Sequence, residues 1–143
     1  MKIFKLKTVA LLGLIVFASA CVKQETPKVA NERFEPTESD SMTLSGTFQS
    51  SPRHDACGTV EVFSTADGQV VSFLNFNGEN GPNLRVYAST SLSDNAFVEL
   101  GELIAVEGDF SYTTSASTDF TTYKNIIIWC ADFDVLFGSA ELQ

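Results

Sequence analysis

The sequence predicts an all-β protein: a small antiparallel β-sandwich or flattened barrel that follows a signal peptide and a flexible tether. Three observations lead to this prediction. From Thr43 onward, apolar and polar residues alternate with a period of two, as they do in half-buried strands. Turn-forming residues, such as Asp67-Gly68 and the stretch 77–83, separate the apolar segments. The first twenty residues instead join positive charge to a single short apolar run.

The N-terminus has the composition of an export signal. Three lysines lie within the first seven residues, and the apolar run Val9–Phe17 is shorter than the roughly 20 residues that a membrane-spanning helix needs. Ala18-Ser19-Ala20 suits the general signal peptidase, which would release a plain secreted protein. The cysteine that follows, Cys21, also resembles the acylated cysteine of a bacterial lipobox, although lipoboxes more often carry Leu at the position of Ala18. We predict a lipoprotein signal peptide over residues 1–20.

An acylated Cys21, with palmitate among its expected acyl chains, would attach the protein to a membrane of the bacterial cell envelope. The attached domain would face the periplasm or the cell surface. Residues 21–42 are mostly acidic and polar, and too few of them are apolar to offset the entropy lost on ordering. We therefore predict a flexible acidic tether over residues 21–42 and a β domain over residues 43–143.

The alternation gives the expected strands in order. Val60 and Val62 alternate with polar residues, and Asp67-Gly68 is an expected hairpin turn because glycine tolerates a positive φ. Residues 98–106 also fit a short helix, but Gly101 favours two short strands. The last strand is expected to stop near Gly138. The predicted strands cover residues 43–49, 59–62, 70–76, 84–89, two segments within 98–106, 109–113, 125–131 (a central strand) and 134–137.

Composition excludes several functions. Eighteen acidic against nine basic residues leave a net charge of −9, so a nucleic-acid partner is not expected. The sequence has no C-x-x-C-H haem-attachment motif, no C-x-x-C pair, no glycine-rich phosphate loop and no H-E-x-x-H metal motif. His54 is the sole histidine, and no serine lies in G-x-S-x-G, so a catalytic triad is nearly excluded. We expect a redox or binding module rather than an independent enzyme.

The cysteines are the remaining candidates for chemistry. Besides Cys21 the chain has Cys57 and Cys130, an even pair in an oxidising compartment, and this predicts a Cys57–Cys130 disulfide. The alternative is a functional thiol at Cys130. An apolar strand beside Asp132 is a poor setting for a nucleophilic thiolate, but the sulfur could still be a soft ligand to a metal or to haem iron. His54 is either a hydrogen-bonding loop residue or a further ligand.

Several segments, taken in order, resemble the DM-thirteen domain, which is described as an electron-transfer domain of extracellular proteins. The Trp-Cys pair followed by F-x-x-x-F-G is the most specific of them. The matching residues are Gly46-Thr47-Phe48, His54, Gly58-Thr59-Val60, Asn75-Phe76, Gly81-Pro82-Asn83-Leu84, Val86-Tyr87, Leu100-Gly101, Tyr112, Ile128-Trp129-Cys130, Phe133 and Phe137-Gly138.

The resemblance implies a β-rich fold and a hallmark cysteine at Cys130. That cysteine would act as a bare thiol or by holding a prosthetic group such as haem, with His54 and Trp129 in the expected cofactor neighbourhood. The family also occurs in short bacterial lipoproteins and beside DOMON domains, so a separate redox partner protein is expected here. Cys57 departs from the family, which usually has a small residue there, and could lock Cys130 in a disulfide.

Two functions follow as hypotheses. The first is a membrane-anchored extracytoplasmic electron-transfer or redox module centred on Cys130, with Cys57 as a second redox residue. The alternative is a non-redox binding or interaction module of the cell envelope with a structural Cys57–Cys130 disulfide. The sequence does not identify a cofactor.

Overall fold

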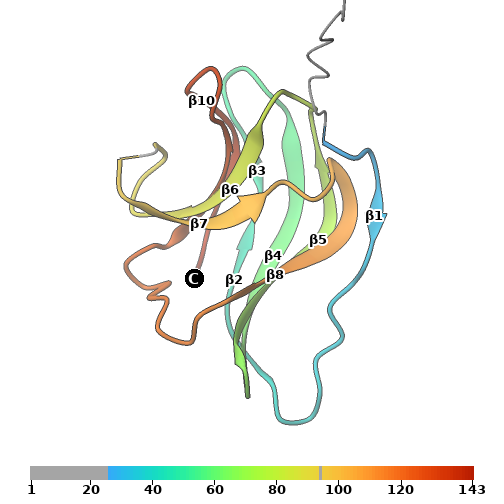
Figure 1. The fold of residues 1–143 in the computed structure, drawn as a ribbon, viewed down its shortest axis with the longest axis vertical. Coiled ribbons are helices and arrows are strands. Elements are labelled where there is room, and N and C mark those ends of the chain that lie inside the picture. Colours follow the sequence, from blue (N-terminus) through green and yellow to red (C-terminus); the bar gives the residue numbers. More distant parts are fainter. Residues whose placement is uncertain (1–25, 94) are drawn as a thin grey trace, which may run out of the picture.

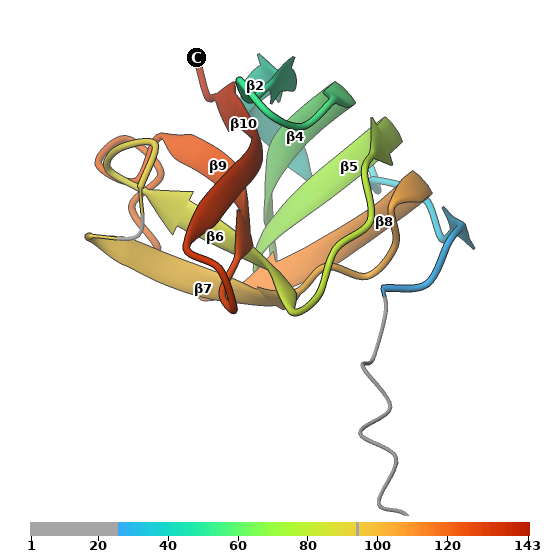
Figure 2. The same ribbon diagram turned by 90° about the horizontal axis from the view of Figure 1, so that it is seen from above.

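The computed structural model describes residues 26–93 and 95–143, which form two five-stranded β-sheets packed face to face (Figures 1 and 2). Within these residues every regular element is a strand, so the predicted all-β sandwich is confirmed. The first sheet has the order β1 (Ala30–Asn31), β8 (Glu107–Thr114), β5 (Gly68–Gly78), β4 (Ala56–Thr65) and β2 (Ser41–Thr47). The second has the order β3 (Gln49–Ser50), β10 (Val135–Glu141), β9 (Asn125–Cys130), β6 (Leu84–Ser89) and β7 (Phe97–Glu102).

The predicted signal peptide and the acylation site at Cys21 lie outside the described residues. No helix long and apolar enough to cross a membrane occurs in the part of the chain that the structure describes.

The period-two alternation located most strands correctly. β4 and β5 form the hairpin expected at Asp67-Gly68, and Gly68 has a φ of 146°. β9 lies between β10 and β6 with all six of its residues buried, as expected for a central strand. All strand pairs are antiparallel except β1 with β8, which is parallel. The sequence did not predict β1 or β3, each only two residues long.

Several strand predictions were wrong in extent, among them 43–49, which was predicted as one strand but is divided between β2 and β3. The segment 98–106 forms one strand, β7, rather than two, and the chain leaves the sheet after Glu102. There the Tyr112 hydroxyl donates to the carbonyl of Glu102 (2.9 Å) and accepts from the amide of Ile104 (3.1 Å), which fixes an irregular connection. β10 runs past Gly138 to Glu141. Gly138 does not end the strand but lies at a bulge within it. A glycine is needed at this position because a Cβ would lie 2.5 Å from the Cβ of Ala56.

An aromatic cluster fills the space between the sheets. Phe73 is fully buried, and its ring lies 4.8 Å from Phe110 and 5.2 Å from Phe48. Phe48 also marks the point where the chain passes from the first sheet to the second, since β2 pairs with β4 and β3 pairs with β10. Burying this residue therefore holds the two sheets together at a corner.

Residues of the predicted tether lie along the first sheet. The amide of Val106 donates to the carbonyl of Pro27 (3.1 Å), and β1 pairs with Gly108 and Asp109 of β8. β2 begins at Ser41, within the range predicted for the tether. Composition did not predict these contacts, because they are mostly backbone hydrogen bonds that polar residues make as well as apolar ones. The division of the chain into tether and domain stays a prediction.

Candidate functional site

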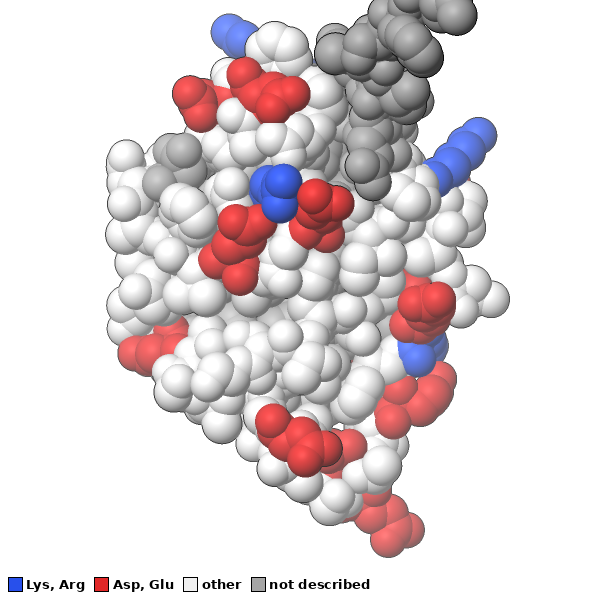
Figure 3. Space-filling view, viewed as in Figure 1, with Lys and Arg blue, Asp and Glu red and all other residues white. Residues whose placement is uncertain are grey.

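Three loops meet at one end of the sandwich, and we call this the three-loop end. The loops are residues 51–55 between β3 and β4, residues 79–83 between β5 and β6, and residues 131–134 between β9 and β10. Hydrogen bonds join them across the sequence: Asn83 donates to Asp132 (2.8 Å), and His54 pairs with Glu79 (2.8 Å). All three loops lie at the top of Figure 1, where Figure 3 shows acidic side chains close together.

Cys130 lies beneath the three-loop end, inside the core. It is the last residue of β9, and it points inward with Ile126 and Ile128, so its exposed fraction is only 1%. The Sγ donates to the carbonyl of Pro82 (3.1 Å). The neighbouring amide, that of Ala131, donates to the carbonyl of Asn83 (3.1 Å). Loop 79–83 therefore covers the thiol and supplies its hydrogen-bond acceptor.

The predicted Cys57–Cys130 disulfide is wrong: both cysteines are free thiols. Cys57 is near the start of β4 and is exposed, whereas Val60 and Val62 of the same strand point into the core. The two sulfurs thus belong to different sheets and different environments, one facing solvent and the other the interior. A bond between them would require the start of β4 to turn over.

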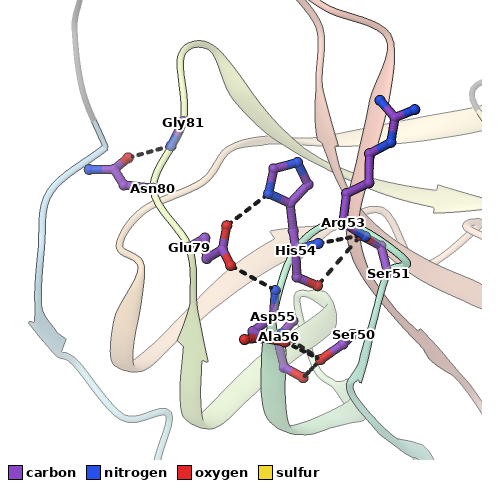
Figure 4. A network of polar contacts seen from close by, with 9 residues as sticks. All are labelled: Ser50, Ser51, Arg53, His54, Asp55, Ala56, Glu79, Asn80 and Gly81. Carbon is purple, nitrogen blue, oxygen red and sulfur yellow. Dashed lines mark hydrogen bonds and ion pairs between the residues drawn. The ribbon is translucent and has the colours of Figure 1, made fainter.

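His54 is held in loop 51–55 by contacts on three sides. Its ring stacks on Phe137 with centroids 3.7 Å apart and planes inclined by 8°. Its Nδ1 lies 2.8 Å from one carboxylate oxygen of Glu79, and the amide of Asp55 donates to the other oxygen (3.2 Å) (Figure 4). These hydrogen bonds, the His54 one first, lower the pKa of Glu79 below its ordinary value of 4.5. The Ser51 hydroxyl accepts from the His54 amide (3.0 Å).

Phe137 connects His54 to the core around the thiol. It is 7% exposed and belongs to the same core cluster as Cys130 and Leu84. Gly81 lies directly against its ring, since a Cβ there would approach the Phe137 Cζ to 2.7 Å. His54, Phe137 and loop 79–83 are therefore one packed unit above the buried sulfur. Sequence reasoning missed Glu79 as the partner of His54, because the two residues are 25 positions apart in sequence and belong to no motif with a known spacing.

Trp129, the other expected member of the site, points the opposite way. It packs on the outer face of the second sheet with Tyr87 and Ile127, and its Nε1 is buried without a hydrogen-bond partner among the described residues. Neighbouring residues of a strand face opposite sides, so Trp129 and Cys130 cannot share a site inside the sandwich. The structure brings His54 and Cys130 to one end but places Trp129 in a buried cluster on the other face of the second sheet.

These residues, as arranged, do not fit a haem. Among the described residues, the one buried sulfur, that of Cys130, is hydrogen-bonded to a carbonyl, His54 has one ring face covered by Phe137, and Trp129 belongs to a separate buried cluster. Among the described residues, no three side chains of His, Cys, Asp or Glu are grouped as ligands for a metal ion.

A polar cleft of about 420 Å³ lies elsewhere, beside β2, β3 and the C-terminal residues. None of the predicted site residues lines it. Its lining residues are Ser45, Gly46, Thr47, Gln49, Thr59, Glu141 and Gln143.

Comparison with protein families gives a match. The family model described as "Electron transfer DM13" matches residues 47–142, a range that includes all three loops and Cys130. Comparison with curated proteins and with solved structures gave no match. Because the matched range covers well over half of the chain, the protein belongs to the DM-thirteen family of electron-transfer domains.

Proposed function

We propose that this protein is a membrane-anchored, extracytoplasmic electron-transfer module whose redox centre is the single thiol of Cys130. The observation that carries the proposal is the isolation of this thiol beneath loop 79–83, within the range that matches the electron-transfer family. Lipid anchorage through Cys21 at the bacterial cell envelope is supported by the basic, apolar and small residues that precede that cysteine.

A lone interior thiol restricts the chemistry. With Cys57 on the solvent side of β4, the domain has no second thiol that can pair with Cys130. Oxidation of Cys130 to a disulfide therefore needs a sulfur from another molecule, and in this proposal that molecule is a partner redox protein. The deprotonated sulfur attacks a disulfide of that partner and forms one mixed disulfide, while the partner's other sulfur leaves as a thiolate and takes up a proton from water. Cys130 is oxidised, and the departing sulfur is reduced.

Access to the thiol is the structural condition for this step. The sulfur is buried and donates a hydrogen bond to the carbonyl of Pro82, so loop 79–83 must move before a partner sulfur can approach. His54 and Glu79 join that loop to loop 51–55 and thereby resist the movement. In this proposal they position the loop and do not react.

One observation favours a second function, a binding or interaction module in which Cys130 is only a core residue. A buried, hydrogen-bonded cysteine is typical of an inert structural position. Phe133, which is 65% exposed in loop 131–134, would then be a contact residue for a protein partner. The two functions differ in whether Cys130 reacts while the domain stays folded.

The experiment uses the full-length protein purified with its lipid, in a Cys57→Ser background that leaves Cys130 as the only domain thiol. Oxidised and reduced glutathione are varied at fixed pH, and mass spectrometry measures the adduct at Cys130. Electron transfer through the thiol predicts a reversible adduct that forms faster than global unfolding. Reaction only at the rate of unfolding would instead support the interaction module.

Two controls complete the test. Cys130→Ser keeps a hydroxyl that can donate to the Pro82 carbonyl, so it should fold and form no domain adduct. The visible absorption spectrum of the unmodified protein is recorded as well. An absorption band that disappears in Cys130→Ser would contradict the bare-thiol centre, because it would show a bound chromophore at that sulfur.

A further inference from the structure

Residues 26–34, which we call the strap, connect the predicted anchor to the first sheet. Backbone bonds hold the strap to β8 and its approach: Val106 donates to Pro27, and the amide of Glu32 donates to Asp109 (2.8 Å). At its far end the ring of Phe34 lies 5.2 Å from that of Phe63 on β4. The composition of this segment predicts a flexible linker, and in the structure its residues lie against β8 and β4.

A glycine makes this docking possible. Gly108 of β8 pairs with Ala30 of the strap and has a φ of 112°. A Cβ at this position would overlap the carbonyl group of Ala30. The backbone of the strap therefore lies directly against a position of β8 that only glycine can occupy.

The strap begins at the three-loop end. The side-chain amide of Asn80, in loop 79–83, donates to the carbonyl of Thr26 (3.2 Å). From there the strap follows β8, whose first residue, Glu107, pairs with Asn77 near the same end. Figure 1 shows the beginning of the strap (blue) at the top, on the side of the molecule where the three loops lie.

This placement limits how far the three-loop end can be from the anchor. Five Cα steps separate Cys21 from Thr26, and a fully extended chain covers at most about 18 Å over that distance. If the strap were a free linker, as its composition suggests, the extended chain from Cys21 to Ser41 could span about 70 Å. Docking of the strap therefore shortens the reach of the anchor roughly fourfold and fixes the point from which it is measured.

We propose that the docked strap turns the three-loop end, with Cys130 beneath it, toward the membrane that holds the lipid anchor. The proposal rests on the proposed anchorage through Cys21. The reaction partner is then a redox protein held in the same membrane, and it reaches the thiol from the side of the bilayer.

Charge favours a basic protein surface over the lipid itself. The three loops expose four carboxylates and one guanidinium, so they are repelled by anionic headgroups but attracted to a basic partner. Exposed Phe133 adds an apolar contact among these charges. The charged residues are Asp55, Glu79, Asp132, Asp134 and Arg53.

The test measures orientation and needs no partner. Acylated full-length protein in the Cys57→Ser background is placed in phosphatidylcholine vesicles that carry an energy acceptor on some headgroups. A donor dye is attached either at Phe133→Cys, in the three-loop end, or at Asp67→Cys, in the exposed hairpin turn at the other end. We expect several-fold stronger quenching of the dye at position 133.

Two substitutions separate docking of the strap from general strain. Gly108→Ala should displace the strap and make quenching at the two positions nearly equal. Gly101→Ala is the matched control: its φ of 146° imposes comparable strain, but its Cβ would meet only the Tyr112 ring, at 3.5 Å. This control should preserve the difference. If Gly108→Ala fails to fold, inserting about twenty Gly and Ser residues after Lys23 lengthens the reach without touching the strap.

The outcomes distinguish failure of the orientation from failure of the anchor. Equal quenching at positions 133 and 67 in protein whose Cys21 carries lipid by mass would overturn the proposed orientation and leave the anchorage intact. Absence of lipid on Cys21 would overturn both. A difference that survives the Gly-Ser insertion would show that something other than the strap sets the orientation, and it would overturn the role of the strap.

Discussion

The two ends of the sandwich are closed in different ways. At the far end, residues 114–122 bond mainly among themselves: Asp119 accepts from Thr121 and Thr122, and Thr114 pairs with Thr118. At the three-loop end, local bonds within each loop are joined by bonds between segments distant in sequence, such as His54 with Glu79 and Asn83 with Asp132. A locally closed loop can change without affecting its neighbours, whereas a change in one of the three loops is transmitted to the cover of Cys130.

The largest expected effect comes from removing the ring that connects His54 to the core. Phe137→Ala should lower the free energy of unfolding by about 3–5 kcal/mol, and Phe120→Ala, a buried residue of the far end, should cost a similar amount. In the Cys57→Ser background, only Phe137→Ala should accelerate alkylation of Cys130 beyond the rate set by unfolding. Equal acceleration in both variants would show that the two ends do not differ in coupling.

An intermediate effect is expected at Asn83, which has a φ of 48° and bonds to both Asp132 and Arg85. Asn83→Ala should cost about 2 kcal/mol, from lost hydrogen bonds and a left-handed alanine. It should also accelerate hydrogen exchange at the Ala131 amide, because this amide donates its hydrogen bond to the Asn83 carbonyl.

The far-end counterpart of Asn83 is Gln69, whose amide donates to three carbonyls of residues 115–118. Gln69→Ala should cost about 1 kcal/mol. It should leave exchange at Ala131 unchanged, and faster exchange there would contradict a difference between the ends.

The smallest effect concerns pH. The pKa of Glu79 is lowered in the folded state, so its contribution to stability is present above its ordinary value of 4.5 and is lost as the pH falls through the folded value. Glu79→Gln should therefore unfold at a lower denaturant concentration than the wild type at pH 7. The difference between the two denaturant midpoints should disappear in acid.

Asp119→Asn is the corresponding change at the far end. Hydrogen bonds from Thr121 and Thr122 lower the pKa of Asp119 to about 2. The difference in denaturant midpoint between Asp119→Asn and the wild type should therefore disappear between about pH 4 and pH 2. Denaturant midpoints measured from pH 7 to pH 2 check both variants. Identical pH profiles would show that the two carboxylates are not distinguished by their hydrogen-bond partners.

Alternation in the sequence predicted most of the fold because several strands bury one face more fully than the other. The same alternation, followed one step further, separates the cysteines. Since Val60 and Val62 point inward, Cys57 lies at an outward position, whereas Cys130 shares the inward positions of Ile126 and Ile128. The disulfide was predicted from the oxidising compartment alone, without considering the face of the strand on which each cysteine lies.

Other features of the site leave no signal in a single sequence. The contact between His54 and Glu79 depends on how two separate loops come together. The docking of the strap depends on backbone bonds and on one glycine in another strand. Neither residue type nor local periodicity encodes such contacts, so only the assembled fold shows them.

The pairing of Ser45 with Gln143 has a consequence for how the domain folds. Each backbone amide donates to the other residue's carbonyl, at 3.1 and 2.9 Å, although the two residues lie at opposite ends of the domain sequence. Such contacts give a high contact order, and β-sandwiches of this kind fold over about milliseconds to seconds rather than microseconds. Because Ser45 cannot make this pair before Gln143 has been synthesised, the sandwich is completed only after the chain has been made through residue 143.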